Sequence, residues 1–341
     1  MKIISIFQHG TKRTFLAAFW AFLVALWAVE CPAFFGAKFE PPDGKTLHCA
    51  QAEVRPKSTK LISVDWSGLE EYVEASGKRP KLIMHYISFD ERAFALLKPT
   101  IAEISQKKFD YIPQIGLDFY IYGEPADILR PVDITQKIAQ GAYDDHIHVL
   151  AEMFKNMGTP AFIRPGYEFG GSGHGRFASK TYWAQAWRRI YDIFQQDDAK
   201  NVAFVWNTLD AADFIDYYPG DDCVDWWGIN VFINHADRDT FINDFIREAK
   251  AHKKPVMIAE STPRYVGSVG GREAWVNWYQ PYFNLIYRYP HVKAFCYINA
   301  SWEGYPDQSF ASDCRIQNNQ IVLERYRTVL SDKNFIHAEE K

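Results

Sequence analysis

Residues 162–171, FIRPGYEFGG, contain the pattern that best predicts the fold of this 341-residue chain. A short apolar run leads into Glu168, a glycine-rich loop follows, and a helical pattern comes after the loop. Residues 254–260, KPVMIAE, repeat the first half of this pattern and end at Glu260. In an α/β barrel, the groups that do chemistry lie at the carboxyl ends of the strands. The two stretches therefore predict an α/β barrel that carries two carboxyl groups at its mouth.

Apolar runs of strand length alternate with helical patterns over residues 46–332, which predicts a single (β/α)8 TIM barrel. The runs are almost continuously apolar, as expected of strands covered on both faces. A doubly wound open sheet is disfavoured, because the first connection lacks a phosphate-binding glycine fingerprint. The predicted strands are 46–50, 81–88, 111–117, 161–168, 202–206, 224–232, 255–260 and 292–299. The predicted helices are 69–75, 93–106, 134–157, 182–194, 241–252, 274–287 and 321–330, and the connection at 210–221 is expected to hold only a turn or two.

The amino terminus has the pattern of an export segment. Basic residues precede an apolar run at 14–29, which is long for a signal peptide and short for a membrane span. We expect residues 1–33 to be a signal peptide or a membrane anchor, so that the protein is secreted, periplasmic or held at a membrane by this segment. Residues 34–45 are expected to form an extended lead-in to the barrel, and residues 333–341 a tail.

Composition narrows the classes of function. The chain is 48% apolar and 23% charged, which is typical of a folded globular protein. Its net charge of −4 offers no basic field for a nucleic acid. Aromatic residues make up 16% of the chain, which fits either a large aromatic core or flat platforms on which sugars stack.

The cysteines show no CxxC spacing, so neither a zinc site nor a redox motif is indicated. Closure of the barrel would place Cys49 and Cys296 on neighbouring strands. An exported protein could pair some of its cysteines, but burial as small apolar side chains is the favoured interpretation.

The two glutamates suggest the chemistry. Glu168 ends the fourth predicted strand and Glu260 the seventh, so they are expected to face each other across the mouth. Glycoside hydrolysis uses two carboxyl groups that flank the scissile bond, one of which donates a proton. Either glutamate alone would be read as a salt-bridged loop residue, but the pair points to catalysis. The other residues at or just past predicted strand ends are His85, Asp90, Asp118, Trp206, Phe232, Asn299, Trp302 and Glu303.

On these residues the chain resembles glycoside hydrolase family 26, a family of retaining (β/α)8 enzymes. The matching pieces run in order through the fourth to seventh strands. The resemblance implies that Glu168 is the acid/base and Glu260 the nucleophile. It also implies β-mannan, mixed-linkage β-glucan or β-xylan as the substrate. The pieces are RPGYE at 164–168, FVW at 204–206, YPGDD at 218–222 with VDWWG at 224–228, and KPVMIAE at 254–260.

Two positions depart from the mannanases of that family. Tyr167 stands where they have histidine, and Phe232 lies near the place of a tyrosine that donates a hydrogen bond to the nucleophile. A phenyl ring cannot donate that bond. Another residue, such as Tyr167 or Tyr297, would then have to orient Glu260, and the departures leave room for a different sugar.

Weaker signals extend the expected substrate-binding set to Arg164, Tyr167, Trp206, Phe232, Trp302, His85 and Asn299. Arg164 precedes Glu168 by four residues, which puts both on one side of an ideal strand, where the arginine could orient a carboxylate or brace the barrel. Trp206 could be a sugar platform or part of the core. Trp302 follows the last strand in a loop, so we expect it to stack on sugar.

No metal and no cofactor is expected. Residues 144–148, DDHIH, contain metal-binding residue types, but they lie within a predicted helix, where positions two apart do not share a face. The glycine loop at 171–175 lacks the spacing of a nucleotide-binding loop.

Three hypotheses follow. The leading one is an exported retaining glycoside hydrolase that acts on a β-linked polysaccharide or oligosaccharide. The alternative is a carbohydrate-binding barrel with little or no turnover. A metal-dependent barrel hydrolase is the third, but only His85 offers a ligand at a strand end. The oligomeric state is not predicted.

Overall fold

The computed structural model describes residues 34–52, 66–89, 101–121, 131–170, 179–304 and 312–341, together with Pro99 and Phe177. The predicted signal or anchor segment, 1–33, lies outside the described residues, as do Asp90 and the glycine loop at 171–175.

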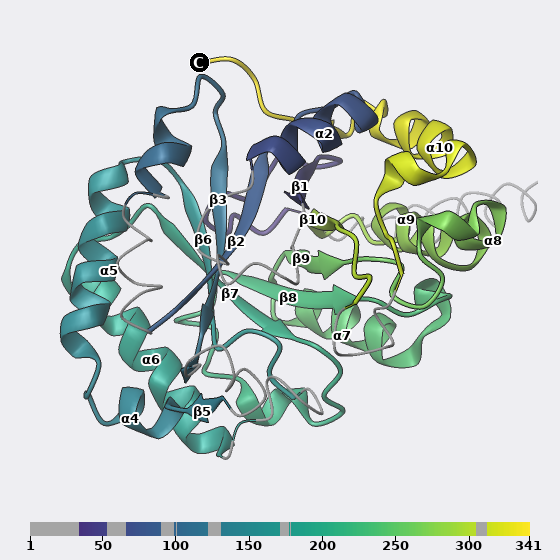
Figure 1. Cartoon of the computed structure of the whole chain (residues 1–341). Coiled ribbons are helices and arrows are strands. Elements are labelled where there is room, and N and C mark those ends of the chain that lie inside the picture. Colours follow the sequence, from purple (N-terminus) through teal and green to yellow (C-terminus); the bar gives the residue numbers. More distant parts are fainter. Residues whose placement is uncertain are drawn as a thin grey trace, which may run out of the picture. The chain divides into compact units, whose positions relative to one another are not determined.

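Eight parallel strands form a closed barrel within the described part of the chain (Figure 1). Each strand pairs with the next along the chain, and the last pairs with the first, which excludes an open doubly wound sheet. All eight predicted strands are confirmed, with ends that differ by a few residues. The strands are β1 (Thr46–Ala52), β2 (Leu82–Ser88), β3 (Ile112–Asp118), β6 (Ala161–Pro165), β7 (Val202–Thr208), β8 (Trp226–Val231), β9 (Val256–Ser261) and β10 (Val292–Asn299).

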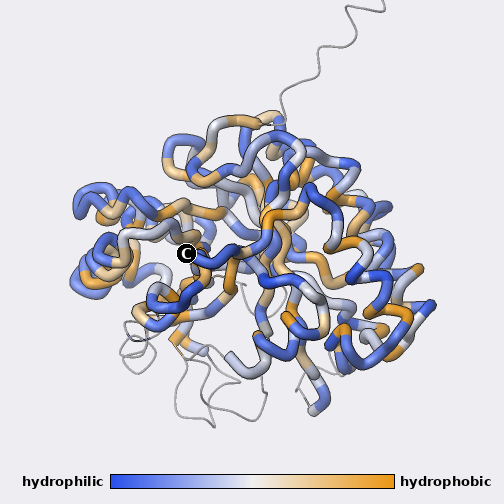
Figure 2. Tube along the Cα trace, turned by 90° about the horizontal axis from the view of Figure 1, so that it is seen from above, coloured by the Kyte–Doolittle hydropathy of each residue, from blue (hydrophilic) through white to orange (hydrophobic). Residues whose placement is uncertain are grey.

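Helices surround the barrel, and Figure 2 shows hydrophobic and hydrophilic positions alternating along them, as one-sided packing requires. The larger ones are α2 (Trp66–Ser76), α5 (Asp144–Met157), α6 (Lys180–Gln196), α7 (Thr240–Ala251), α9 (Gln280–Arg288) and α10 (Gln320–Leu330). Shorter turns are α4 (Thr135–Ala139), η2 (Phe214–Tyr217), η3 (Ala236–Arg238), η4 (Ser268–Gly270), α8 (Arg272–Ala274), η5 (Trp275–Tyr279) and η7 (Ile316–Asn318). β4 (Tyr120–Ile121) and β5 (Val132–Asp133) form a small hairpin, and β11 (Phe335–Ile336) pairs with β1.

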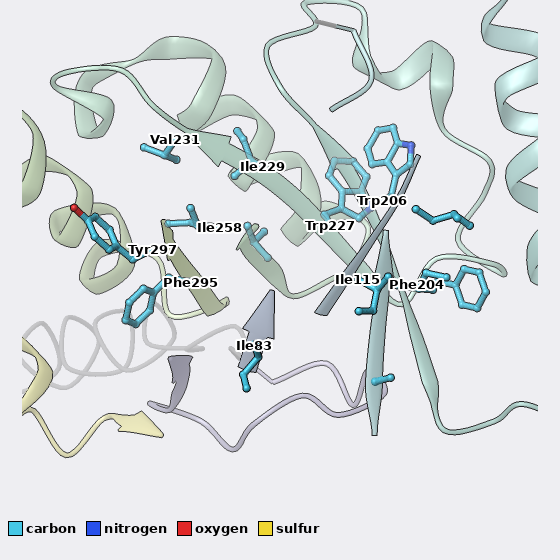
Figure 3. Close-up of a cluster of buried hydrophobic side chains, with 14 of the residues drawn as sticks. Ile83, Ile115, Phe204, Trp206, Trp227, Ile229, Val231, Ile258, Phe295 and Tyr297 are labelled. Carbon is cyan, nitrogen blue, oxygen red and sulfur yellow. The ribbon is translucent and has the colours of Figure 1, made fainter. Parts of the chain in front are cut away.

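Strand alternation divides the core into two layers. On β7, Ala203 and Val205 point into the barrel, whereas Phe204 and Trp206 point outward to the helices. Figure 3 shows part of the outer layer, in which Trp206 lies beside Trp227 with ring centroids 4.7 Å apart. Most of the buried aromatic side chains belong to this outer layer, and each of them buries about 150–250 Å².

The expected lead-in, 34–45, lies against the amino-terminal end of the barrel. Phe39 packs on the interior residue Phe162, and Lys38 Nζ donates to the carbonyl of Val202 over 2.8 Å. The fully buried Lys293 donates to the carbonyl of Pro42 over 3.2 Å. These contacts close the end of the barrel that lies opposite the carboxyl ends of the strands.

Candidate active site

Glu260 lies at the carboxyl end of β9 and points into the barrel mouth. Its side chain is nearly buried, and Oε1 accepts a hydrogen bond from Arg164 Nη1 over 2.7 Å. Arg164 comes from β6, so the bond crosses the barrel interior. The predicted position of Glu260 at a strand end facing the fourth strand is confirmed.

A β-bulge aims Glu260 inward. Opposite β8, Ile229 pairs with Ile258 and the next residue, Asn230, pairs with Glu260, so Ala259 is an extra residue in β9. Ala259 already points into the barrel, and strict alternation would turn Glu260 outward. Bulges re-aim side chains in this way next to active sites.

Glu168 lies outside the strand in which it was predicted. β6 ends at Pro165, and Glu168 follows in a turn with a φ of 57°. The prediction that Arg164 and Glu168 share one side of a strand was therefore wrong, because strand alternation does not extend to Glu168. A left-handed non-glycine residue costs about 1–3 kcal/mol, and such strain clusters at functional sites.

A chain of hydrogen bonds joins the two glutamates through side chains from three strands. Arg164 Nη1, which binds Glu260, also donates to Asn207 Oδ1 over 2.7 Å. Asn207 Nδ2 donates to Asn230 Oδ1 over 3.1 Å, and Asn230 Nδ2 donates to Glu168 Oε1 over 2.7 Å. The arginine has only donors, so it fixes the orientation of both amides in turn. Glu168 Oε1 is thereby held as an acceptor.

The two asparagines in the middle of this series of hydrogen bonds are almost completely shielded from solvent. Asn207 is 0% exposed and Asn230 is 3% exposed. Neither residue stood out in the sequence, because asparagines inside otherwise apolar runs are compatible with many local roles. A buried amide at an inward position of a barrel strand is the signal that could have identified them.

Arg164 is fully buried, with its guanidinium near the rings of Tyr86 and Tyr167 at 5.6 and 5.1 Å. Burial is the largest single influence and would lower the pKa of Arg164, but the charge and hydrogen bond of Glu260 together with Tyr86 and Tyr167 outweigh it, and the pKa lies above its usual value. Arg164 Nε and Nη2 are buried and have no hydrogen-bond partner among the described residues.

Gly116 makes room for this cluster. Gly116 pairs with Tyr86 on one side and with Arg164 on the other, so the three residues form one row across β2, β3 and β6. A Cβ at Gly116 would lie 2.8 Å from the Tyr86 ring and 3.1 Å from both Arg164 Nη2 and the Tyr167 ring. Only glycine leaves space for the arginine between the two rings.

Tyr86 is a site residue that the sequence reasoning missed. Desolvation and then the charge of Glu260 raise the pKa of Tyr86, and a hydrogen bond from its hydroxyl to Glu260 contributes as well. This tyrosine thus supplies the donor that Phe232 cannot. The inward alternation of Leu82 and Met84 on β2 could have identified it.

Four expectations about single residues need correction. His85 neighbours Tyr86 on β2 and so faces the helices, on the same side as Ile83 and Ile87. Trp206 is 0% exposed, and its Nε1 donates to the carbonyl of Tyr217, so it belongs to the core. Asn299 accepts from the backbone N–H of Ile316 and donates to Gln317, and it thereby holds η7. The Tyr297 hydroxyl bonds to Tyr279 and Cys314 on the helix side and cannot orient Glu260.

Phe232 and Trp302 are 7% and 8% exposed and belong to the cluster inside the barrel. Phe232 follows Asn230 by two residues, so both point into the mouth. Tyr167, at 9% exposure, lies beside Tyr86 with ring centroids 5.3 Å apart and ring planes tilted by 41°. Each of these three aromatic side chains keeps only a small exposed area, so their role in binding sugar stays a prediction.

Among the described residues, no group of three or more His, Cys, Asp or Glu is arranged to hold a metal ion. His148 of the 144–148 stretch instead pairs with Asp197 at 2.6 Å. No helix in the described ranges is both long and apolar enough to span a bilayer.

Comparisons with known proteins agree with this geometry. Residues 130–289 match the family model described as glycosyl hydrolase family 26. A β-1,3-xylanase from Vibrio sp is 26% identical over 86% of this chain and 69% of its own length. A β-1,3-xylanase from Alcaligenes sp is 25% identical over 59% of this chain and 49% of its own length, so this chain spans about half of that relative.

A solved structure of a modular endo-β-1,4-mannanase from Cellulomonas fimi superposes with a TM-score of 0.60 at 14% identity. The match covers 86% of this chain and 72% of the mannanase. At this identity the likeness concerns the fold alone. Together with the family model, which covers residues 130–289, and the xylanase relatives, it makes the chain similar in sequence and in fold to glycosyl hydrolase family 26, and this similarity supports a hydrolase of O-glycosyl bonds.

Proposed function

We propose that this enzyme is a retaining glycoside hydrolase in which Glu260 is the nucleophile and Glu168 the acid/base. The observation that carries the proposal is the hydrogen-bonded chain from Glu260 through Arg164, Asn207 and Asn230 to Glu168. It fixes both carboxyl groups at one mouth with different partners. Retention requires carboxyl groups about 5–5.5 Å apart, because one of them bonds the anomeric carbon directly.

Glu260 is equipped to attack as an anion. Arg164 supplies a positive charge and a hydrogen bond, and Tyr86 supplies a second donor. Both contacts hold the carboxylate in one orientation. Attack on the anomeric carbon gives a covalent glycosyl-enzyme, and the leaving oxygen departs with a proton.

Glu168 is equipped to carry that proton. Asn230 donates an N–H to Oε1, so Glu168 would carry its proton on the other oxygen, Oε2. The amide is neutral, so it holds the carboxyl group without the charge that would keep it permanently ionised. After the first step, Glu168 accepts a proton from the water that hydrolyses the glycosyl-enzyme.

The substrate class is proposed to be a β-linked polysaccharide or oligosaccharide, with β-xylan first among the candidates. The names of the two xylanase relatives support this order. Phe232 and Trp302 belong to the cluster inside the barrel and keep a small exposed apolar area, on which we infer that a sugar ring stacks. β-Mannan and mixed-linkage β-glucan remain on the panel to be tested.

The test is a screen of purified protein on β-1,3-xylan, β-1,4-xylan, β-mannan and mixed-linkage β-glucan, with release of reducing ends as the readout. Binding to the same panel is measured in parallel with the Glu260→Gln variant as the matched inactive control. We expect turnover by the wild type and binding by both proteins. Binding without turnover by the wild type would support the carbohydrate-binding alternative and contradict the proposal.

A further inference from the structure

Two cysteines lie opposite each other at the seam where the barrel closes. In the pairing between β1 and β10, Cys49 is the direct partner of Cys296. Both side chains belong to the cluster inside the barrel and are 1% and 0% exposed. The sequence favoured burial of these residues as small apolar side chains over pairing.

Both cysteines are free in the structure, and the distance between their sulfur atoms favours pairing. The two Sγ atoms are 2.6 Å apart. Carbon atoms that are not bonded pack best at about 3.5–4.0 Å, and sulfur is the larger atom. Neighbouring strands lie about 4.7–4.9 Å apart, which falls within the Cα separation of about 4.4–6.8 Å that disulfides require. Direct partners on parallel strands also point to the same face, so the strands need not move to bring the sulfurs into bonding range.

We propose that Cys49 and Cys296 form a disulfide that locks the first barrel strand to the last. Each sulfur loses its proton, a sulfur–sulfur bond forms, and the two electrons reduce a disulfide donor to two thiols. The co-reactant is thus a small-molecule disulfide or the active-site disulfide of a thiol oxidoreductase. The proposal does not depend on which sugar the enzyme cleaves.

Burial determines when the bond forms. Desolvation and then the neighbouring Cys49 raise the pKa of the Cys296 thiol well above its usual value, so thiolate is scarce in the folded barrel. Exchange therefore takes place while the seam is still open, during folding. Once formed, the bond is shielded from reductants until the barrel unfolds.

The bond would act on both stability and the site. It joins residues 247 positions apart, and long closed loops restrict the unfolded chain most. The carbonyl of Cys296 accepts a hydrogen bond from Ser261 Oγ over 2.6 Å, and Ser261 follows Glu260 directly on β9. The disulfide would therefore hold β10 in place, and β10 is the strand against which β9, with Glu260, is hydrogen-bonded.

The other described cysteines offer no competing pair, because Cys223 and Cys314 make their sulfur contacts to carbonyl oxygens.

To test the proposal, the reduced and denatured full chain is refolded with a mixture of reduced and oxidised glutathione. It is then denatured in excess alkylating reagent, digested and analysed by mass spectrometry. We expect peptides joined through Cys49 and Cys296, two hydrogen atoms lighter than the thiol forms, and alkylated Cys223 and Cys314. If Cys49 and Cys296 are both recovered in alkylated form from protein that had refolded, the proposal is overturned.

A second readout compares denaturation midpoints with and without reductant. The midpoint should be higher for the oxidised wild type than for the reduced one, and Cys223→Ser should show the same difference. Cys49→Ala should lose the difference while it still folds, because alanine is a small apolar replacement. Equal midpoints for oxidised and reduced wild type would contradict the proposal, whatever the variants do.

Discussion

The residues that the proposed mechanism needs most are the two glutamates and the amide that holds one of them. Glu260 is bound by a buried cation and a tyrosine, whereas Glu168 is bound by the neutral side chain of Asn230. Two carboxyl groups at one mouth can take different roles only if their surroundings differ. Substitutions at these positions should therefore separate the roles of attack and proton transfer.

Glu260→Ala should lower kcat by about a thousandfold or more, which corresponds to roughly 4 kcal/mol of transition-state stabilisation. Azide should restore part of the turnover, because a small anion can attack in the space left by the carboxylate. Its product should be a glycosyl azide with the anomeric configuration opposite to that of the substrate. Product analysis by NMR checks this, and an azide product of unchanged configuration would count against Glu260 as the nucleophile.

Asn230→Ala should move the alkaline limb of the kcat/KM profile to higher pH. The amide donates to Glu168 Oε1 and so favours its ionised form, and without it the protonated, proton-donating form persists to higher pH. kcat should fall most for poor leaving groups and least for activated aryl glycosides. Asn201→Ala is the matched control, because the side-chain amide of Asn201 donates to the carbonyls of Phe154 and Thr159 and to neither glutamate. An unchanged pH profile in Asn230→Ala would refute the role of this amide.

At the scale of the elements, apolar runs predicted every barrel strand, because strands buried on both faces are marked by continuous hydrophobicity. Because such a run is apolar at every position, it does not indicate which side chains point into the barrel. The sequence therefore predicted His85 as a substrate-binding residue, although its neighbour Tyr86 is the one that points inward. The bulge at Ala259 and the left-handed turn at Glu168 arise from tertiary packing, and local pattern carries no sign of them. Trp206 was ambiguous because one large aromatic residue suits both a core and a sugar platform.

Gly116→Ala tests the row across β2, β3 and β6. The added Cβ would lie 2.8 Å from the Tyr86 ring and 3.1 Å from Arg164 Nη2, with little free space around them. Overpacking of this kind costs about 1–3 kcal/mol of unfolding free energy, and displacing Arg164 should also lower kcat. Gly270→Ala is the matched control, since its Cβ would have no neighbour nearer than 3.4 Å. Wild-type stability and kcat in Gly116→Ala would show that the row is not tightly packed.

At the scale of the whole molecule, closure of the barrel brings residues from β2, β6, β7, β8 and β9 to one mouth. This closure makes the hydrogen-bonded chain between the glutamates possible, because its members are far apart in sequence. The sequence predicted the closure and the two glutamates. It could not predict the hydrogen bonds that connect the two glutamates, since these depend on the register between strands.

Export is a property of the whole chain, and the basic residues before the apolar run at 14–29 lead us to propose it. Cells that express the full chain are fractionated, and the amino terminus of the mature protein is sequenced. We expect the protein outside the cytoplasm or at a membrane. Soluble cytoplasmic protein with Met1 intact would contradict this proposal and leave the proposed chemistry untouched.

The most direct test of the proposed mechanism is the configuration of the first product. Proton NMR follows the anomeric signals during hydrolysis of a β-linked substrate, before the released sugar mutarotates. Two displacements, first by Glu260 and then by water, predict that the β-anomer is released first. Initial release of the α-anomer would mean a single displacement by water, and would contradict the assignment of Glu260 as nucleophile and Glu168 as acid/base.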